Sequence, residues 1–289
     1  AKGRPQDNPL IVHIHTLSEL QPLVKNVPER ADVLMRKFWP GPLTIIFNKS
    51  DIVPYGTTGG LDTIAVRMPD HPVALALLKE SRVPIAAPSA NISGRPSPCR
   101  AEDVIEDLYG RIDMILDGGA CPVGVESTVL DLSGEPLILR PGGVTKEALE
   151  QVMGSVKVDP GLLPGMTPRS PGQKYKHYAP KASMTVIEGS INRQIAKIKQ
   201  LTEQFESMGL KVGIMATAQT KLLYDKGIVV SVGDREAPLT ISSNLFTILR
   251  KFDQLGVDKI LAEGISKEGL GLAVMNRMHK ASGYDVIKV

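Results

Sequence analysis

The chain has 289 residues, of which 42% are hydrophobic, and its 34 basic and 31 acidic residues leave a net charge of +3. This length fits two domains with a core each better than one domain, and so small a net charge excludes chain-wide attraction to nucleic acid. The two cysteines, Cys99 and Cys121, are too few and too far apart in sequence for a zinc ribbon or a redox pair. We therefore expect no disulfide and a reducing compartment.

The sequence offers no sign of a membrane protein. No run of apolar residues approaches the length of a membrane span, and residues 1–7 lack the apolar core of a signal peptide. We expect a soluble, cytoplasmic protein that makes no membrane contact.

The first half of the chain mixes predicted helices and strands. Helices are expected over residues 28–38, 71–80 and 101–109, and strands over 43–47, 63–68, 112–116, 127–132 and 137–140. In the strand over 63–68, alternation puts Ile64 and Val66 on one face and Thr63 and Arg67 on the other. This order predicts a mixed, twisted open sheet.

Two polar stretches stand out near these elements. The apolar run that ends at Pro88 predicts a buried strand, and Ser89 and Asn91 in the turn after it could face a pocket together. A solvated turn is the commoner meaning of an isolated Ser-x-Asn. Lys2 and Arg4 project to one side of an extended backbone. There the compact ammonium of Lys2 and the planar guanidinium of Arg4 can together bind a triphosphate or a carboxylate.

From about residue 158 to 180 the periodicity is lost and Pro and Gly recur, which is typical of a linker. This predicts a first domain over 1–157, a linker over 158–181 and a second domain over 182–289. The linker also contains Tyr175, His177 and Tyr178, which are unusual in a plain spacer. It is either a lid over a binding pocket or a simple interdomain spacer.

The last hundred residues alternate strands and helices. Strands are expected over 184–187, 211–215, 228–232, 259–262 and 285–289, and helices over 191–208, 241–255 and 272–280. Such alternation predicts a small, parallel, doubly wound, Rossmann-like domain. The fold class is therefore α/β, with two different sheets joined by a Pro/Gly-rich linker.

An ordered series of motifs runs from the N-terminus to the linker. Its members are Lys2-Gly3-Arg4-Pro5 with Asn8-Pro9-Leu10, Phe38-Trp39-Pro40-Gly41-Pro42-Leu43-Thr44, Ala65-Val66-Arg67-Met68-Pro69, Ser89-Ala90-Asn91-Ile92-Ser93-Gly94, Gly124-Val125-Glu126-Ser127-Thr128-Val129, Leu139-Arg140-Pro141-Gly142-Gly143 and His177-Tyr178-Ala179-Pro180. The series resembles the long, two-domain form of the threonylcarbamoyl-AMP synthase family. That family carries a strand–helix–strand portion ahead of the first motif, so we expect an N-terminally incomplete synthase domain.

The resemblance implies a role for each matching residue. Lys2 and Arg4 match the catalytic cations. The residues that match the ATP contacts are Arg4, Asn8, Thr63, Ser89, Asn91, Ser97, Arg140 and His177. The residues that match the threonine site are His13, Arg67, Ala87 and Ser127. In the family, the segment with His177 folds back over the synthase pocket as a lid.

The implied activity is that of an L-threonylcarbamoyladenylate synthase, a nucleotidyltransferase that turns L-threonine, bicarbonate and ATP into threonylcarbamoyl-AMP and pyrophosphate. The implied partner is the tRNA threonylcarbamoyl transferase machinery, which uses the product to modify tRNA. His13 and His15 would share a strand face, but no third ligand with suitable spacing follows, so no protein-bound metal is predicted. Mg²⁺ is expected to arrive on the phosphates of ATP.

Two alternatives remain open from the sequence. One is a non-catalytic protein whose basic groove binds duplex RNA or tRNA, because resemblance in fold does not establish chemistry. The other is a carbamoyl-transfer domain that uses carbamoyl phosphate, although the companion acylphosphatase and zinc-finger modules are absent from the sequence.

Overall fold

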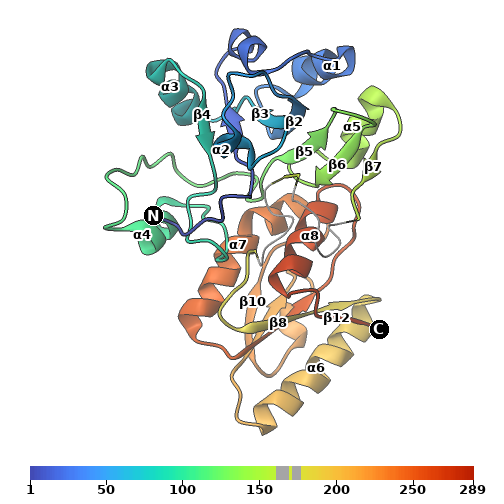
Figure 1. Cartoon of the computed structure of the whole chain (residues 1–289). Helices are drawn as coiled ribbons and strands as arrows, with labels where there is room; N and C mark the ends of the chain where they lie inside the picture. Colours follow the sequence, from blue (N-terminus) through green and yellow to red (C-terminus); the bar gives the residue numbers. More distant parts are fainter. Residues whose placement is uncertain (161–168, 171–176) are drawn as a thin grey trace. The chain divides into compact units, whose positions relative to one another are not determined.

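The structure is a computed structural model that describes residues 1–160, 169–170 and 177–289. Its described residues fall into two compact units that interleave along the chain (Figure 1). The first unit comprises Gly3–Ser89 and Glu126–Tyr175, and the second comprises Ala1–Lys2, Ala90–Val125 and Lys176–Val289. Within the part of the chain described, no helix combines the length and the apolar character needed to cross a membrane.

The first unit is built on a seven-stranded mixed sheet with the order β4-β1-β3-β2-β5-β6-β7. Its strands are β1 (Ile11–His13), β2 (Leu43–Asn48), β3 (Thr63–Arg67), β4 (Ile85–Ala87), β5 (Thr128–Asp131), β6 (Leu137–Arg140) and β7 (Lys157–Val158). The pairings β1–β3, β2–β5 and β6–β7 are parallel, whereas β1–β4, β2–β3 and β5–β6 are antiparallel. The predicted mixed sheet is confirmed.

Helices cover one face of this sheet. The unit contains α1 (Glu29–Phe38), α2 (Tyr55–Thr58), α3 (Pro72–Ser81), α5 (Lys146–Met153) and two short 3₁₀ helices, η1 (Leu17–Glu19) and η2 (Gln21–Leu23). Leu34 of α1 and Leu149 of α5 are fully buried against Ile45 and Val66 in the main core. The apolar cluster on the other face consists only of strand residues among those described, namely Ile11, Ile46, Ala65, Val129, Leu139 and the half-buried Leu137.

The second unit is built on a five-stranded sheet in which every pairing is parallel, with the order β10-β9-β11-β8-β12. Its elements are α4 (Ala101–Leu108), β8 (Ser183–Glu188), α6 (Ile191–Ser207), β9 (Val212–Ala216), η3 (Lys221–Leu223), β10 (Ile228–Ser231), α7 (Pro238–Leu255), β11 (Lys259–Glu263), α8 (Gly271–Ala281) and β12 (Val286–Lys288). These elements confirm the predicted doubly wound sheet.

Alternate residues of each strand pack on opposite sides of this sheet. Val186 and Ala262 lie in the core with helices α7 and α8, whereas Ile187 and Leu261 lie in the core with α6. Because strand side chains point alternately to the two faces, the near-continuous apolar strands of this unit need helices on both sides.

Three predictions about elements were wrong or incomplete. Residues 112–116 form no strand, and Met114 and Leu116 are exposed rather than paired. The strand before Pro88, predicted as buried, is β4, which lies beside β1 at the edge of the sheet as far as the structure describes it and is half-exposed. Helix α5 was not predicted, although Thr145 caps it by accepting a hydrogen bond from the Ala148 amide at 3.2 Å.

The first unit continues to the predicted linker and the second begins within it, but residues 90–125 pack with the C-terminal residues. The predicted boundaries at 157 and 182 remain a prediction about the domains as folding units. Tyr175 of the predicted lid lies outside the described residues.

Candidate functional site

The strand registers place four predicted site residues of the first unit on the face without helices. His13 lies opposite Arg67 in the β1–β3 pairing, and Ile11, two residues before His13, lies opposite Ala87 in β4. Thr63 is four residues before Arg67 in the same strand. Since paired residues share a face and alternate residues do so as well, His13, Arg67, Ala87 and Thr63 all lie on the side of Ile11.

The turn between α1 and β2 orients Arg67. The Arg67 Nε donates a hydrogen bond to the carbonyl of Gly41 at 2.9 Å, and the Trp39 indole donates to the carbonyl of Leu43 at 2.7 Å. A Cβ atom at Gly41 would come within 2.3 Å of the Phe38 carbonyl oxygen, so only glycine fits this turn. The Phe-Trp-Pro-Gly-Pro motif therefore has a physical reason, because its turn places the carbonyl that accepts from Arg67.

His13 is held neutral next to that arginine. Burial, followed by the positive charge of Arg67, lowers the pKa of the His13 imidazole to about 4. A neutral imidazole has one nitrogen that donates and one that accepts a hydrogen bond. A neutral His13 can therefore donate or accept a hydrogen bond beside the positive charge of Arg67.

Ser127 and Arg140 meet at the ends of β5 and β6. The Arg140 Nη2 donates to the Ser127 carbonyl oxygen at 3.0 Å and to its hydroxyl oxygen at 3.2 Å, and the Ser127 hydroxyl lies 2.7 Å from that of Thr44. Ser127 and Arg140 are buried. A Cβ atom at Gly142 would come within 2.3 Å of the Glu126 carbonyl oxygen, so the Pro-Gly-Gly turn after Arg140 also requires glycine.

Arg4 is anchored beside these residues. Its Nη2 donates to the carbonyl oxygens of Pro9 at 2.8 Å and Asn8 at 3.2 Å. Burial, followed by the positive charge of Arg140, lowers the pKa of the Arg4 guanidinium, so the two cations lie within electrostatic reach of each other. Repulsion between them is relieved when an anion binds.

Two buried polar atoms in this region lack a hydrogen-bond partner among the described residues. They are the Nε of Arg4 and the Oδ1 of Asn8. Buried polar groups are normally satisfied, so this unsatisfied donor and this unsatisfied acceptor indicate a place for a ligand. Ser89, a further predicted ATP contact of the same unit, is exposed two residues after the end of β4.

The other predicted residues belong to the second unit. The Lys2 carbonyl oxygen accepts a hydrogen bond from the Ser93 amide at 3.0 Å. Asn91 is buried, its amide nitrogen donates to the carbonyls of Ile92 at 2.9 Å and Arg95 at 3.0 Å, and its Oδ1 has no partner among the described residues. The structure thus ties Lys2 to the Ser-Ala-Asn turn.

His177 is attached to the same turn through its neighbours. The Ala179 amide donates to the Gly94 carbonyl oxygen at 3.0 Å. Tyr178 is buried, and its ring packs on Phe246 of α7 with 5.1 Å between ring centroids. Ser97, the remaining predicted ATP contact, is buried as well.

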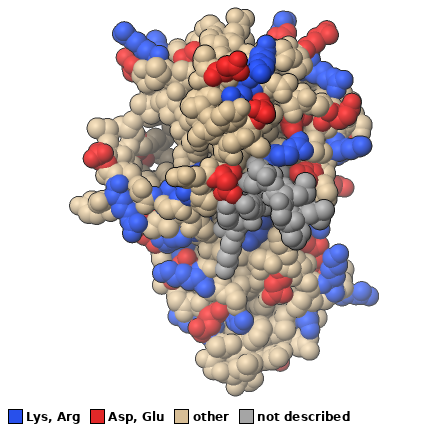
Figure 2. Space-filling view, viewed as in Figure 1, with Lys and Arg blue, Asp and Glu red and all other residues tan. Residues whose placement is uncertain are grey.

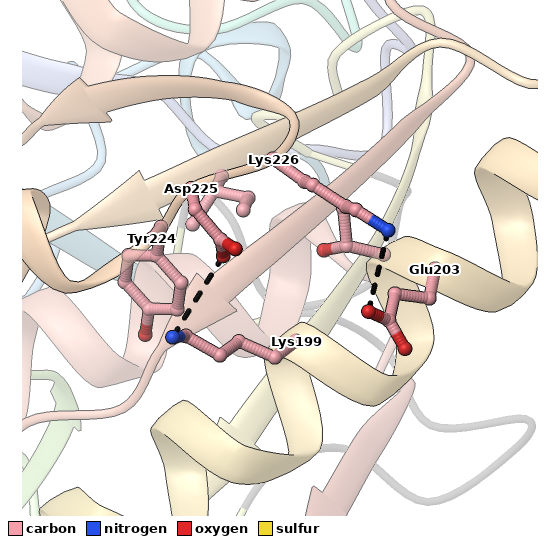
Figure 3. A pocket seen from close by; sticks show the side chains of 7 residues that line it. Lys199, Glu203, Tyr224, Asp225 and Lys226 are labelled. Carbon is pink, nitrogen blue, oxygen red and sulfur yellow. Dashed lines mark hydrogen bonds and ion pairs between the residues drawn. The ribbon is translucent and has the colours of Figure 1, made fainter.

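One cavity of the second unit contains none of the predicted residues. It lies beside α6 and β9 and is lined by Lys199, Thr202, Glu203, Ile214, Tyr224, Asp225 and Lys226 (Figure 3). Lys199 pairs with Asp225 at 3.7 Å and Lys226 with Glu203 at 3.3 Å. Such exposed ion pairs contribute little to stability. The cavity is therefore a solvated hollow in the surface and not a preorganised binding site.

Sequence reasoning missed Gly41 as the acceptor for Arg67 and Thr44 as the partner of Ser127. Both lie in the quoted Phe38–Thr44 motif. The signal that could have identified Thr44 is its position between Leu43 and Ile45 in an apolar strand, where a hydroxyl needs a partner.

Comparison with known proteins gives the same family over the whole chain. A family model described as "Telomere recombination" matches residues 1–142, and one described as "Threonylcarbamoyl-AMP synthase, C-terminal domain" matches residues 144–283. The threonylcarbamoyl-AMP synthase of Pyrococcus abyssi is 51% identical over 100% of this chain and 84% of its own length. That of Bacillus subtilis is 50% identical over 100% of this chain and 83% of its own length.

A solved structure agrees with these relatives. The crystal structure of P. abyssi Sua5 complexed with L-threonine matches with a TM-score of 0.95 and 50% identity, and the match covers 100% of this chain and 84% of that one. The motif resemblance, both family models and the full-length relatives coincide, and the chain belongs to the threonylcarbamoyl-AMP synthase family.

Proposed function

We propose that the protein is an L-threonylcarbamoyladenylate synthase. The observation that carries the proposal is the gathering of Arg4, Arg140 and Ser127 with His13 and Arg67 in a unit whose sheet leaves one face without helices. This arrangement offers a cationic place for phosphates and a second place for an amino acid. The relatives at about half identity carry the same activity in their names.

In the threonine half of the proposed site, Arg67 binds the carboxylate and the neutral His13 contacts the amine or hydroxyl. The small Ala87 leaves room for the substrate, and Ser127 supplies a hydroxyl. A related structure was solved with L-threonine, which supports threonine as the amino acid.

The reaction joins two anions. Bicarbonate and the threonine amine condense to a carbamate with loss of water. A carbamate oxygen then bonds to the α-phosphorus of ATP while the bond to the bridging oxygen of the pyrophosphate breaks. The rate depends on positioning and charge neutralisation, which Lys2, Arg4, Arg67 and Arg140 supply, and no covalent enzyme intermediate is needed.

ATP is proposed to contact Arg4, Asn8, Thr63, Ser89 and Arg140 in the first unit. It is also proposed to contact Asn91, Ser97 and His177 in the second. The unsatisfied atoms of Arg4, Asn8 and Asn91 support this assignment.

Mg²⁺ is proposed to enter as part of the substrate, bound to the ATP phosphates. Among the described residues, no group of three or more His, Cys, Asp and Glu side chains is placed to hold a metal. The product is proposed to pass to a tRNA threonylcarbamoyl transferase.

Non-catalytic RNA binding is the less favoured proposal. On the face shown in Figure 2, Lys and Arg side chains are interspersed with Asp and Glu and form no basic stripe. Proteins that bind duplex RNA or tRNA through the backbone need such a stripe.

Pyrophosphate release tests the proposal. The purified protein is mixed with ATP, Mg²⁺, bicarbonate and each amino acid in turn. The proposal predicts release that requires both threonine and bicarbonate. Release that is independent of the amino acid, or none at all, would contradict it.

The same assay tests selectivity. Serine lacks only the threonine methyl group, which is worth about 1 to 3 kcal/mol in an apolar pocket. Serine should therefore be a poor but detectable substrate. Equal rates for serine and threonine would argue against a fitted threonine pocket.

A further inference from the structure

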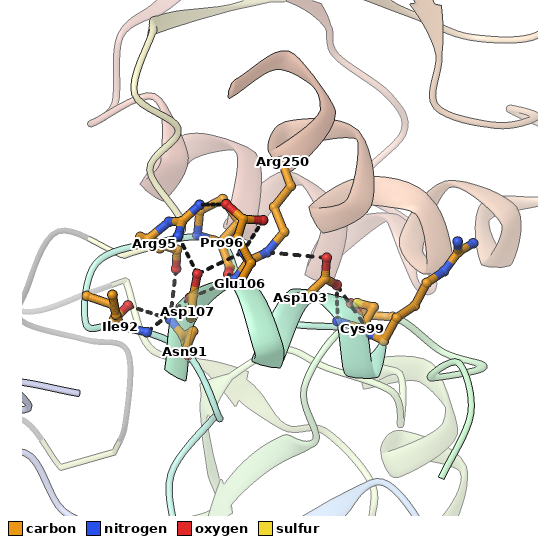
Figure 4. A network of polar contacts seen from close by, with 11 residues as sticks. Asn91, Ile92, Arg95, Pro96, Cys99, Asp103, Glu106, Asp107 and Arg250 are labelled. Atoms are coloured by element: carbon orange, nitrogen blue, oxygen red, sulfur yellow. Dashed lines mark hydrogen bonds and ion pairs between the residues drawn. The ribbon is translucent and has the colours of Figure 1, made fainter. Parts of the chain in front are cut away.

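A buried carboxylate organises the turn after Ala90 in the second unit. Asp107, in α4, is buried, and its Oδ2 accepts a hydrogen bond from the Ile92 amide at 3.0 Å. Its Oδ1 accepts from a guanidinium nitrogen of Arg95 (Figure 4). One carboxylate therefore fixes both a backbone amide and a side chain of the segment from Asn91 to Ser97.

Arg250 of α7 completes this network from 143 positions further along the chain. Its Nη1 and Nη2 donate to the two oxygens of Asp107 at 3.1 and 3.0 Å, and Nη2 also donates to the Pro96 carbonyl oxygen at 2.7 Å. Only 2% of the Arg250 side chain is exposed, so the pair is shielded from water. A planar, bidentate fork of this kind fixes geometry as well as charge.

The contacts of the network enclose the turn at both ends. The Asp107 bond to the Ile92 amide holds the start of the turn, and the Arg250 bond to the Pro96 carbonyl holds its end. Asn91 precedes the first of these residues and Ser97 follows the second.

The Asp107 carboxyl is ionised at neutral pH. Burial opposes the charge, but the hydrogen bonds and charge of Arg250, the Ile92 amide and the charge of Arg95 outweigh it and lower the pKa of the Asp107 carboxyl. The ion pair is therefore present throughout the neutral range.

We propose that Arg250 and Asp107 are positioning residues for ATP, and that the C-terminal domain takes part in synthesis by holding Asn91 and Ser97 in place. The inference rests on the proposed function, which assigns ATP contacts to these two residues. Arg250 itself touches the turn and the carboxylate, not the reacting atoms, in this assignment.

A stabilising role alone is the competing explanation. Breaking a buried ion pair by removing one partner is strongly destabilising, so a single substitution would not separate the two roles. Replacing both partners by apolar residues of similar size often preserves stability. In the double variant Asp107→Leu/Arg250→Met, Arg95 keeps its ion pair with the half-exposed Glu106 at 2.6 Å. The Ile92 amide loses its acceptor and the Pro96 carbonyl loses its donor.

The experiment compares ATP and threonine binding by calorimetry, with thermal unfolding measured on the same samples. For the folded double variant, the ATP dissociation constant and the KM for ATP should rise about 10- to 100-fold, because a misplaced contact group loses its alignment. The threonine affinity measured without ATP should be unchanged, since the proposed threonine residues belong to the first unit. Arg250→Lys keeps the charge without the fork and should recover only part of the ATP affinity.

Arg235→Gln is the matched control in the same unit. Arg235 donates to the buried Glu263 at 2.8 Å and its side chain is 18% exposed. Its partners among the described residues are Thr217, Glu263 and the Gly264 carbonyl, none of which belongs to the turn. This variant should unfold at a lower temperature and bind ATP as the wild type does.

Two results would overturn the inference: a folded double variant with wild-type ATP affinity, or an equal loss of ATP affinity in Arg235→Gln. A wild type that binds ATP but releases no pyrophosphate would instead overturn the synthase proposal, and the ATP affinities would still decide the inference.

Discussion

Three proposed site arginines, Arg4, Arg67 and Arg140, each donate a hydrogen bond to a backbone carbonyl oxygen, at 2.8, 2.9 and 3.0 Å. A carbonyl orients a guanidinium without neutralising its charge, whereas a carboxylate would cancel it. The ion pair of Arg67 with the exposed Asp70 is long, at 3.9 Å. These carbonyl contacts orient the three guanidinium groups, and preorganised cations of this kind are what the proposed reaction needs.

Removing one of these cations should lower the rate far more than the stability. We predict that Arg4→Ala lowers kcat/KM about 10²- to 10³-fold, as expected when one preorganised donor is lost from a partly desolvated site. Lys2→Ala should act in the same direction. Steady-state kinetics with thermal unfolding on the same samples measure both effects.

Arg36→Ala is the control for Arg4→Ala. The Arg36 side chain is 77% exposed and pairs with Asp32 at 2.7 Å on the surface of α1. Its removal should leave kcat/KM unchanged. Near-normal turnover in Arg4→Ala would remove Arg4 from the site.

His13 should give the stability a particular dependence on pH. Its folded pKa of about 4 lies below the unfolded value of 6.5. Between these values the His13 imidazole binds a proton in the unfolded chain but not in the folded protein. The free energy of unfolding therefore falls as the pH is lowered from 6.5 towards 4. The contribution is present in full above pH 6.5 and its loss is on the order of 3 kcal/mol near pH 4.

Urea unfolding of the wild type and His13→Gln across this range isolates that contribution from the other titrating groups. The wild type should lose more stability than the variant as the pH falls from 6.5. Parallel curves would contradict a depressed pKa for His13.

At the scale of elements, periodicity predicted nearly all the helices and strands that carry a buried face. The spacing in α1 and the alternation in β3 are direct consequences of burial on one side. The strand predicted over 112–116 failed because an apolar run does not reveal whether a pairing partner is available. The edge position of β4 was hidden for the same reason, since strand order is a tertiary property.

The turn between α1 and β2 should not tolerate a side chain at Gly41. We predict that Gly41→Ala lowers the free energy of unfolding by about 1 to 3 kcal/mol, because the new Cβ atom must displace the Phe38 carbonyl. It should also weaken threonine binding, since the carbonyl of residue 41 is the acceptor for Arg67. Denaturant unfolding and calorimetry with threonine measure the two effects.

Gly134→Ala, in the turn between β5 and β6, is the matched control. A Cβ atom there would have no neighbour within 4 Å. It should change neither stability nor threonine affinity. If Gly41→Ala binds threonine like the wild type, the turn does not set the position of Arg67.

At the scale of the whole molecule, the two compact units are not two contiguous segments of the chain. Residues 90–125 lie along the chain between the two segments of the first unit but pack with the C-terminal residues, where Cys99 shares an apolar cluster with Phe246. Composition and linker signals predict where linkers lie along a chain. They do not predict which buried residues pair in the folded protein. Asp107 and Arg250 illustrate this, because each alone is an ordinary helix residue in the sequence.

This packing predicts which segments unfold together. In native-state hydrogen exchange, the amides of α4 should open with the same free energy as those of α7, because Asp107 of α4 and Arg250 of α7 form a buried ion pair. Their opening should differ from that of β3. Exchange of α4 in step with β3 and not with α7 would contradict the division into these two units.

The most direct test of the function is to follow the carbon of bicarbonate. The protein is incubated with ¹³C-bicarbonate, threonine and Mg-ATP. The nucleotide products are then separated, and their masses are measured by mass spectrometry. The account predicts threonylcarbamoyl-AMP that carries the heavy carbon, together with an equal amount of pyrophosphate. Pyrophosphate with unlabelled threonyl-AMP, or no nucleotide product that contains threonine, would contradict it.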